Sequence, residues 1–176
     1  MIRPCTLIFT ILSAVCQFAL AKPTSFQEHN FSIQLPEGWK AVEPLPPQTT
    51  AFVRSPDGSK GIIIMTLKVS PEKMATASQV ASNEAKEAAI KAGCKIDNEK
   101  DITVNGVIFR TYTIRMTNGV SVVSYTGSAG TTCYAVQGFN NVADAGSDPD
   151  ISASLKSFNL LVTPPKIPAE TKTHKN

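Results

Sequence analysis

Hydrophobic and polar positions alternate along much of the chain, as expected for strands that bury one face. Phe31–Leu35 follows this period of two, and 50–55 and 61–69 are further extended, largely apolar segments. Four more such segments cover 96–104, 107–116, 120–125 and 131–139. Asn105-Gly106 and Asn118-Gly119 separate the first three of these four segments, and Asn-Gly between apolar segments is typical of tight hairpins. The pattern predicts an antiparallel four-stranded meander.

Two helices interrupt or follow these strands. Ala77, Ala81, Ala85, Ala88 and Ala92 form one narrow stripe of a helix that ends near Gly93, so this helix is expected to pack closely on its partner. Asp148-Pro149 is typical of a helix start, and Ile151, Leu155 and Phe158 give the second helix its apolar face. The order of strands, helix, meander and helix predicts an α+β domain.

Two-residue loops fix which residues face each other, and so predict the two faces of the meander. With such loops at Asn118-Gly119 and Ala129-Gly130, Tyr112, Tyr125 and Tyr134 form one row across three strands. The opposite face then carries small side chains, namely Thr111, Thr113, Ser124, Thr126, Cys133 and Ala135. We expect the alanine-rich helix to cover the Cys133 face and the last helix to cover the tyrosine face.

The chain has four cysteines, and two of them lie in the first 21 residues. The remaining pair, Cys94 and Cys133, is predicted to form a disulfide, because paired cysteines in exported chains are usually oxidised. The bond would hold the end of the first helix to the sheet. A reactive or metal-binding pair is the alternative, although no Cys-x-x-Cys motif or nearby histidine favours it.

The two ends of the chain differ from the domain between them. Arg3, an apolar stretch over 7–20 and Ala19-Leu20-Ala21 predict a signal peptide at 1–21 that is cleaved near Ala21. The protein is therefore expected to be periplasmic or secreted. A lipid anchor on Cys16 is the alternative. Residues 22–162 are expected to form one domain, and 163–176 a disordered tail, because that segment holds three prolines and little that is apolar.

The segment Phe31-Ser32-Ile33-Gln34-Leu35-Pro36-Glu37-Gly38-Trp39, with Ile151, Leu155, Ser157 and Phe158 near the end, resembles the PsbP-like superfamily, which includes the DcrB-like envelope proteins. The resemblance extends over residues 26–162. It implies an antiparallel sheet sandwiched between helices (α/β/α), and a non-catalytic accessory or binding role. No functional residue of that superfamily can be transferred to this chain.

Candidate binding residues are few. Trp39, the only tryptophan, is expected to close one end of the core, with an exposed docking role as the alternative. Tyr112, Tyr125 and Tyr134 either line a groove or form a structural stack. Arg110 lies opposite Asp101 across the first hairpin, which predicts a cross-strand ion pair.

The sequence gives little indication of nucleic-acid binding, membrane spanning, catalysis or metal binding. The net charge of +3 and the absence of a basic cluster with interleaved aromatics argue against nucleic-acid binding. After residue 21 no apolar segment approaches the length of a membrane helix. His29 and His174 are the only histidines and neither has ligand or nucleophile spacing, so no catalytic residue, metal or cofactor is predicted.

These observations favour a non-enzymatic accessory protein of the cell envelope that binds another envelope protein. One alternative is a small-ligand carrier with a pocket between the tyrosine face and the last helix. Another is an enzyme whose site has no recognisable motif.

Overall fold

The computed structural model describes residues 23–162, except the side chains of residues 74 and 75. The strands are β1 (Pro23–Phe26), β2 (Phe31–Gln34), β3 (Lys40–Ala41), β4 (Thr49–Arg54), β5 (Lys60–Lys68), β6 (Lys95–Val104), β7 (Val107–Arg115), β8 (Ser121–Ala129), β9 (Thr132–Asn140) and β10 (Asn159–Leu160). The helices are α1 (Met74–Lys91) and α2 (Pro149–Lys156), with short 3₁₀ turns at Gln27–His29 and Pro71–Lys73. The predicted signal peptide and tail lie outside the described residues, so both stay predictions.

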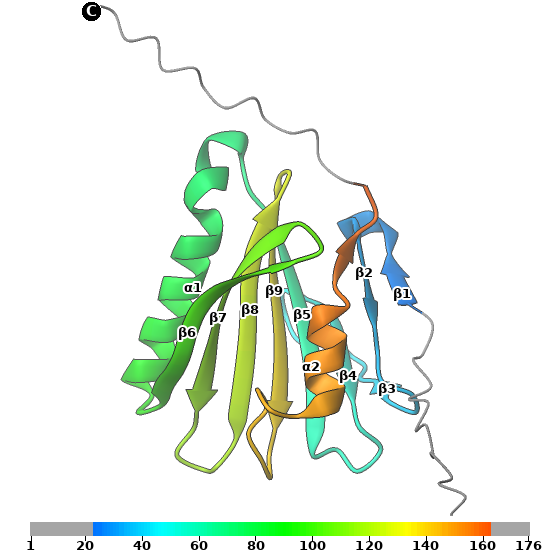
Figure 1. The fold of residues 1–176 in the computed structure, drawn as a ribbon, viewed down its shortest axis with the longest axis vertical. Helices are drawn as coiled ribbons and strands as arrows, with labels where there is room; N and C mark the ends of the chain where they lie inside the picture. Colours follow the sequence, from blue (N-terminus) through cyan, green and yellow to red (C-terminus); the bar gives the residue numbers. More distant parts are fainter. Residues whose placement is uncertain (1–22, 163–176) are drawn as a thin grey trace, which may run out of the picture.

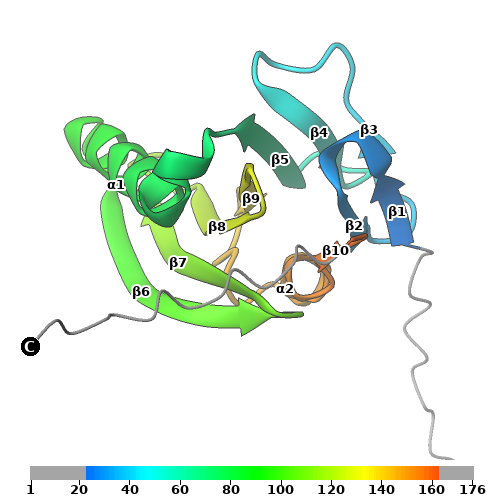
Figure 2. The same ribbon diagram turned by 90° about the horizontal axis from the view of Figure 1, so that it is seen from above.

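A seven-stranded antiparallel sheet in the order β3-β4-β5-β9-β8-β7-β6 forms the centre of the fold (Figure 1). Helix α1 packs on one face of this sheet, and α2 lies on the other (Figure 2). A second sheet in the order β1-β2-β10 stands beside α2 and closes the same side. The predicted α+β class, with helices on both faces of an antiparallel sheet, is confirmed. The sequence does not predict the small sheet, because neither β1 nor β10 has a clear alternating pattern of apolar and polar residues.

The main core lies between the large sheet, α2 and the small sheet. Phe31 and Ile33 of β2, Ile62 and Ile64 of β5, and Ile151 of α2 are fully or almost fully buried there. A smaller apolar cluster under α1 joins Tyr112, Ile114 and Val122 to Ala89 and Cys94. The larger side chains of α2 and the small ones of α1 therefore face different sides of one sheet, as the sequence predicts.

The predicted tyrosine row is wrong at β7. Met116 and Val120 are joined by a hydrogen bond of 2.8 Å from N to O, so the turn has three residues, with Gly119 at φ +88°. Tyr112 therefore pairs with Ser124, and Thr111 with Tyr125. A shift of one residue moves every side chain of a strand to the other face.

On β8 and β9 the predicted faces are confirmed, but the predicted register is wrong by two residues, because the loop between these strands is Gly130-Thr131 and not Ala129-Gly130. Tyr125 and Tyr134 share one face, although the β8–β9 pairing sets them opposite Val136 and Gly127. Ser124, Thr126, Cys133 and Ala135 line the face under α1, together with Tyr112, whereas Thr111 and Thr113 lie on the tyrosine side. Tyr125 and Cys133 thus lie on opposite faces, as predicted.

Candidate binding surfaces

The space between the sheet and α2 is filled by aromatic side chains. The ring of Phe158, just after α2, lies with its centroid 5.2 Å from those of both Tyr134 and Phe109, and 5.4 Å from that of Phe31. The Tyr134 hydroxyl donates a hydrogen bond of 3.1 Å to the His29 carbonyl oxygen. The predicted ligand pocket beneath the last helix is therefore occupied by the protein's own core.

Tyr125 lies beside this aromatic cluster and lines a separate cavity with Thr111 and Thr113. Burial raises the pKa of the Tyr125 hydroxyl above its ordinary value, as it does for Tyr134, so both hydroxyls remain protonated at neutral pH. The predicted trio of tyrosines is thus divided among three environments, since Tyr112 lies under α1.

Tyr112 is 1% exposed, and its hydroxyl has no hydrogen-bond partner within the described residues. The ammonium group of Lys86 lies 5.9 Å from the centroid of its ring. The hydroxyl of Ser82, which faces the sheet from the middle of α1, is also buried and unpaired. Unpaired buried hydroxyls are uncommon because each loses its hydrogen bonds to water without replacement.

A groove runs between α1 and β5 and reaches Tyr112 at its deep end; we call it the α1–β5 groove. Its volume is about 420 Å³. It is lined by Gln48, Met65, Thr66, Leu67, Ala81, Glu84, Ala85, Tyr112, Thr126, Cys133, Ala135 and Gln137. Small residues of α1 form one wall, and β5 forms the other. Glu84 is the single charged residue of this lining.

The groove exists because one helix is too narrow for the sheet. Seven strands at about 4.8 Å spacing span roughly 29 Å, whereas a helix with its side chains is about 10–12 Å wide. Helix α1 packs on β6, β7, β8 and β9, and within residues 23–162 no helix lies over β4 and β5 (Figure 2). Leu67 of β5 is consequently 61% exposed beside the groove.

The alanine stripe in the sequence indicates where this groove lies. The alanines are, however, oriented differently on α1 than predicted. Ala81 and Ala85 line the groove on the flank of α1, whereas the fully buried Ser82 faces the sheet. Ala88 and Ala92 are exposed. The small residues therefore leave open space at the side of the helix as well as allowing close packing beneath it.

The structure contradicts the predicted disulfide, because Cys94 and Cys133 are both free thiols. Cys94 precedes Lys95, which lies in register with Arg115, Ser121 and Asn140 at one end of the sheet. Cys133 lies more than six residues from Asn140, near the other end of β9. Six residues of a strand span about 20 Å, far more than the 4.4–6.8 Å between the Cα atoms of a disulfide. The prediction placed Cys133 on the correct face but at the wrong end of α1.

Cys133 opens onto the α1–β5 groove without being a good nucleophile. Burial raises the pKa of its thiol, which keeps the sulfur protonated at neutral pH. A reactive cysteine needs a nearby positive group to lower its pKa. No Lys, Arg or His lines the groove.

Trp39 is half-buried and packs against the main core, which agrees with the role predicted from sequence. Gly38 before it has a φ of +77°, a conformation that favours glycine. The turn at Pro36-Glu37-Gly38 thus brings the indole back onto the core.

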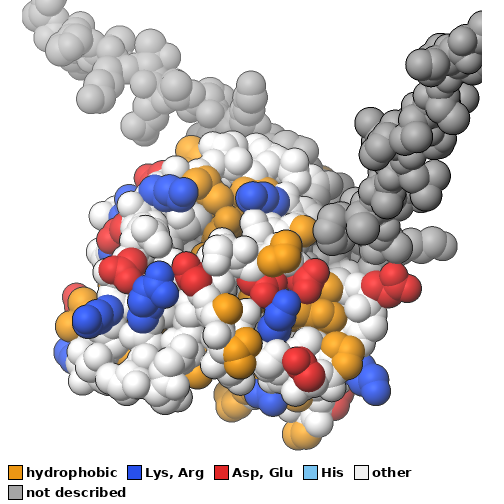
Figure 3. All heavy atoms as spheres, turned by 60° about the horizontal axis from the view of Figure 1, so that its bottom comes forward, with side chains coloured by type: hydrophobic (Ala, Val, Ile, Leu, Met, Phe, Trp, Pro, Cys, Tyr) orange, Lys and Arg blue, Asp and Glu red, His pale blue; other side chains and the backbone are white. Residues whose placement is uncertain are grey.

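The ion pairs of the described residues are structural in character. Asp101 and Arg110 form the predicted cross-strand pair at 3.1 Å. Figure 3 shows acidic and basic side chains intermixed on the face that it presents. The strand register places Lys60 and Arg115 at the same end of the sheet, and both form ion pairs. The carboxylates beside Arg110 and Arg115 raise the pKa values of both guanidinium groups above their ordinary value, so both groups stay charged.

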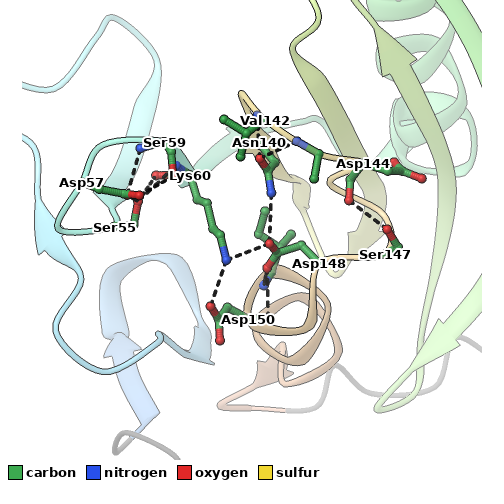
Figure 4. Close-up of polar contacts among 12 residues, drawn as sticks. Ser55, Asp57, Ser59, Lys60, Asn140, Val142, Asp144, Ser147, Asp148 and Asp150 are labelled. Atoms are coloured by element: carbon green, nitrogen blue, oxygen red, sulfur yellow. Dashed lines mark hydrogen bonds and ion pairs between the residues drawn. The ribbon is translucent and has the colours of Figure 1, made fainter.

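The most buried of these charges is Asp148, the N-cap of α2 (Figure 4). Lys60 Nζ lies 2.8 Å from Asp148 Oδ2, which also accepts a hydrogen bond of 3.0 Å from Asn140. Asp148 Oδ1 accepts from the backbone N–H groups of Asp150 and Ile151. Both oxygens are occupied, so this network holds α2 to the sheet and has no free group for a ligand.

Residues 23–162 hold neither a cluster of metal ligands nor a helix suited to a membrane. No group of three or more His, Cys, Asp or Glu side chains is placed to hold a metal ion. His29 is the histidine in this range, and its Nδ1 atom lies 2.8 Å from Thr66 Oγ1. Within the same residues, no helix is both long and apolar enough to cross a membrane.

Comparison with known proteins defines the fold. No family model matches the sequence, and no curated protein matches it either. The solution structure of cyanobacterial PsbP (CyanoP) from Synechocystis sp. PCC 6803 is similar, with a TM-score of 0.58 and 10% identity over 83% of this chain and 95% of that chain. The described domain therefore has a PsbP-like fold.

A crystal structure from Bacteroides thetaiotaomicron VPI-5482 is also similar, with a TM-score of 0.52 and 10% identity. This match covers 74% of our chain but 45% of the Bacteroides chain. At this level of identity, both comparisons establish the fold and do not identify an activity.

Proposed function

We propose that this protein is an exported, non-catalytic accessory protein of the cell envelope, and that it binds an α-helix of another envelope protein in the α1–β5 groove. The single observation that carries the proposal is the uncovered flank of the sheet. There the exposed Leu67 and the half-buried Met65 face Ala81 and Ala85 across open space. Its PsbP-like fold supports an accessory role, and the predicted signal peptide supports export to the periplasm or beyond.

The dimensions of the groove suit a helix. Alanine side chains let a second helix approach α1 to about 8 Å, the short end of the usual range for helix pairs. The bound helix would lie over β5 and cover Leu67, which α1 cannot reach. Helix-in-groove recognition of this kind buries apolar side chains spaced three and four residues apart.

The groove also specifies the chemistry of that helix. Glu84 is the one charge of the lining and favours a basic side chain on the partner. A partner helix with one apolar face and a flanking Lys or Arg would match both the apolar walls of the groove and Glu84.

This chain is a poor source of the helix itself. The sequence after residue 162 contains three prolines, which disfavour helix formation, and the first 21 residues are predicted to be removed. The exposed side of α1 carries Glu87 and Lys91 beside Glu84, so a second copy of α1 would bring charges into an apolar groove. A different protein is therefore the proposed occupant.

The test is affinity purification after crosslinking in the native envelope fraction, with the wild-type protein and two variants. Leu67→Glu places a charge at the groove, and Ile108→Glu places the same charge at a site on β7 that is 66% exposed. We expect one saturable partner that is lost with Leu67→Glu and retained with Ile108→Glu. Equal recovery of the partner by both variants would refute the groove as its binding site.

A further inference from the structure

A second cavity lies on the opposite face of the sheet from the α1–β5 groove. Its floor is formed by Thr111 and Thr113 of β7 and by Val123 and Tyr125 of β8. Its walls are residues 98–100 of β6 and the loop 144–147 that leads to α2. The volume is about 350 Å³, within the range of small-molecule sites. We call this the hydroxyl-lined cavity.

The floor presents two hydroxyl groups to the cavity, those of Thr113 and Tyr125, and neither is among the fully buried unpaired groups, which are the hydroxyls of Ser82 and Tyr112. Thr113 is 3% exposed and Tyr125 is 9% exposed, and within residues 23–162 neither side-chain hydroxyl makes a hydrogen bond. By contrast, Thr111 Oγ1 donates a hydrogen bond of 3.0 Å to the Lys100 carbonyl oxygen. Two free hydroxyls at the bottom of one cavity supply donors and acceptors to whatever enters it.

The walls of the cavity are held in place by a β-bulge and by the ion pairs of Arg115. The pairing of β6 with β7 shifts between Asp97 and Lys100, a β-bulge that leaves residues 98 and 99 out of the ladder. Arg115 links the two walls, because its Nε lies 2.9 Å from Asp97 and its Nη2 lies 3.3 Å from Asp144. Asp144 also accepts hydrogen bonds of 3.1 Å from the Ser121 hydroxyl and the Gly146 N–H. The site is therefore preformed.

The charges around the cavity nearly cancel. Glu99 pairs with Lys86 at 2.6 Å, and Asp144 pairs with Arg115, which leaves Lys100 at the rim. Such a balance favours an uncharged ligand over an anion or a metal ion. Val123 and the ring of Tyr125 add a small apolar surface beside the hydroxyls. A compact ring with several hydroxyls and an apolar face matches both properties.

We propose that the hydroxyl-lined cavity binds a neutral saccharide, with the Thr113 and Tyr125 hydroxyls bonding its ring substituents. This inference concerns a different face from the proposed partner-helix site, so either can fail without the other. It also identifies a small-ligand site that lies beside α2 rather than beneath it.

The test is NMR titration of the ¹⁵N-labelled protein with glucose, galactose, mannose and N-acetylglucosamine, alongside galacturonate as an anionic comparison. We expect saturable shifts at the amides of Thr111, Thr113, Tyr125 and Gly146 with at least one neutral sugar, and weaker binding of galacturonate. Absence of saturable shifts with all four neutral sugars would overturn the proposal, because the cavity would then hold water only.

Two variants locate the binding. Thr113→Val removes a cavity hydroxyl and should weaken sugar binding several-fold. Thr126→Val removes a buried threonine hydroxyl on the α1 face and should leave sugar affinity unchanged. Thermal melting of both variants confirms that they fold. Equal affinities of the two folded variants would overturn the assignment to this cavity.

Discussion

At the scale of single residues, Tyr112 and Tyr134 show how position decides what a buried hydroxyl does. Both are almost fully buried, yet Tyr134 donates to the His29 carbonyl while Tyr112 has no partner. A satisfied hydroxyl contributes about 1 kcal/mol to folding, whereas an unpaired one contributes nothing or opposes it. The Tyr112 hydroxyl therefore contributes no hydrogen bond to the described fold.

This difference predicts opposite results for two matched substitutions. Tyr134→Phe should lower the free energy of unfolding by about 1 kcal/mol, and Tyr112→Phe should leave it unchanged or raise it by up to about 1 kcal/mol. Urea denaturation of the purified protein measures both values. A loss in Tyr112→Phe as large as that in Tyr134→Phe would mean that the Tyr112 hydroxyl is already satisfied.

The free thiols give a second prediction at this scale. Alkylation of the unfolded protein without a reductant, followed by peptide mass spectrometry, should find both Cys94 and Cys133 modified. We expect two free thiols because the cysteines lie at opposite ends of the sheet, which are separated by about 20 Å along β9. A disulfide-linked peptide containing both cysteines would contradict the described arrangement of α1 on the sheet.

At the scale of elements, the contact between α2 and β9 depends on a glycine. A Cβ atom added to Gly138 would collide with the side chain of Ile151. Gly138→Ala should therefore lower the free energy of unfolding by roughly 1–3 kcal/mol through overpacking. Gly146→Ala is the control, because its added Cβ would make only ordinary contacts of 3.6 Å. Chemical denaturation compares them, and equal stabilities would contradict the close approach of α2.

The N-terminus of α2 adds a dependence on pH. Burial by itself raises the pKa of Asp148, but the bonds from Lys60 and from the N–H groups of Ile151 and Asp150 outweigh it, so the pKa is lowered from 3.8. A carboxylate with a lowered folded-state pKa stabilises the protein above its unfolded pKa. That stability is lost as the pH falls through the folded-state pKa.

Asp148→Asn keeps a capping side chain but cannot ionise. Its stability deficit relative to the wild type should be largest near neutral pH and should shrink as the pH falls below about 4. Urea unfolding across this acidic range measures the deficit. A deficit that does not change with pH would show that the ionised carboxylate contributes no stability here.

The elements also show where prediction from sequence succeeds and where it stops. At Asn105-Gly106 a two-residue turn sets Val104 opposite Val107, as predicted, and the Asp101–Arg110 pair follows. At Asn118-Gly119 the turn includes Thr117, and that one extra residue turns Tyr112 away from Tyr125. The same dipeptide is compatible with both turn lengths, so local sequence alone could not distinguish them.

At the scale of the whole molecule, the fold class and the sides of the sheet covered by each helix were predictable, because they depend on the periodicity of side chains. The two candidate sites were not. The α1–β5 groove depends on the width of the sheet relative to one helix, and the hydroxyl-lined cavity depends on a bulge in β6 meeting a distant loop. Such features arise from contacts between segments that no local pattern connects.

The two proposed sites lie on opposite faces of one sheet, so occupation of one would not block the other. The proposed accessory role depends on the first of these sites. Its central claim is that the exposed flank beside α1 is covered by another protein.

Site-specific photo-crosslinking in the native envelope fraction tests that claim most directly, with a photoreactive residue placed at position 67 or, as the control, at position 108. Leu67 and Ile108 have similar exposures of 61% and 66%, so solvent access does not bias the comparison. We expect position 67 to crosslink to one helical peptide of a single partner and position 108 not to crosslink. Crosslinking from 108 alone, or from neither position, would contradict it.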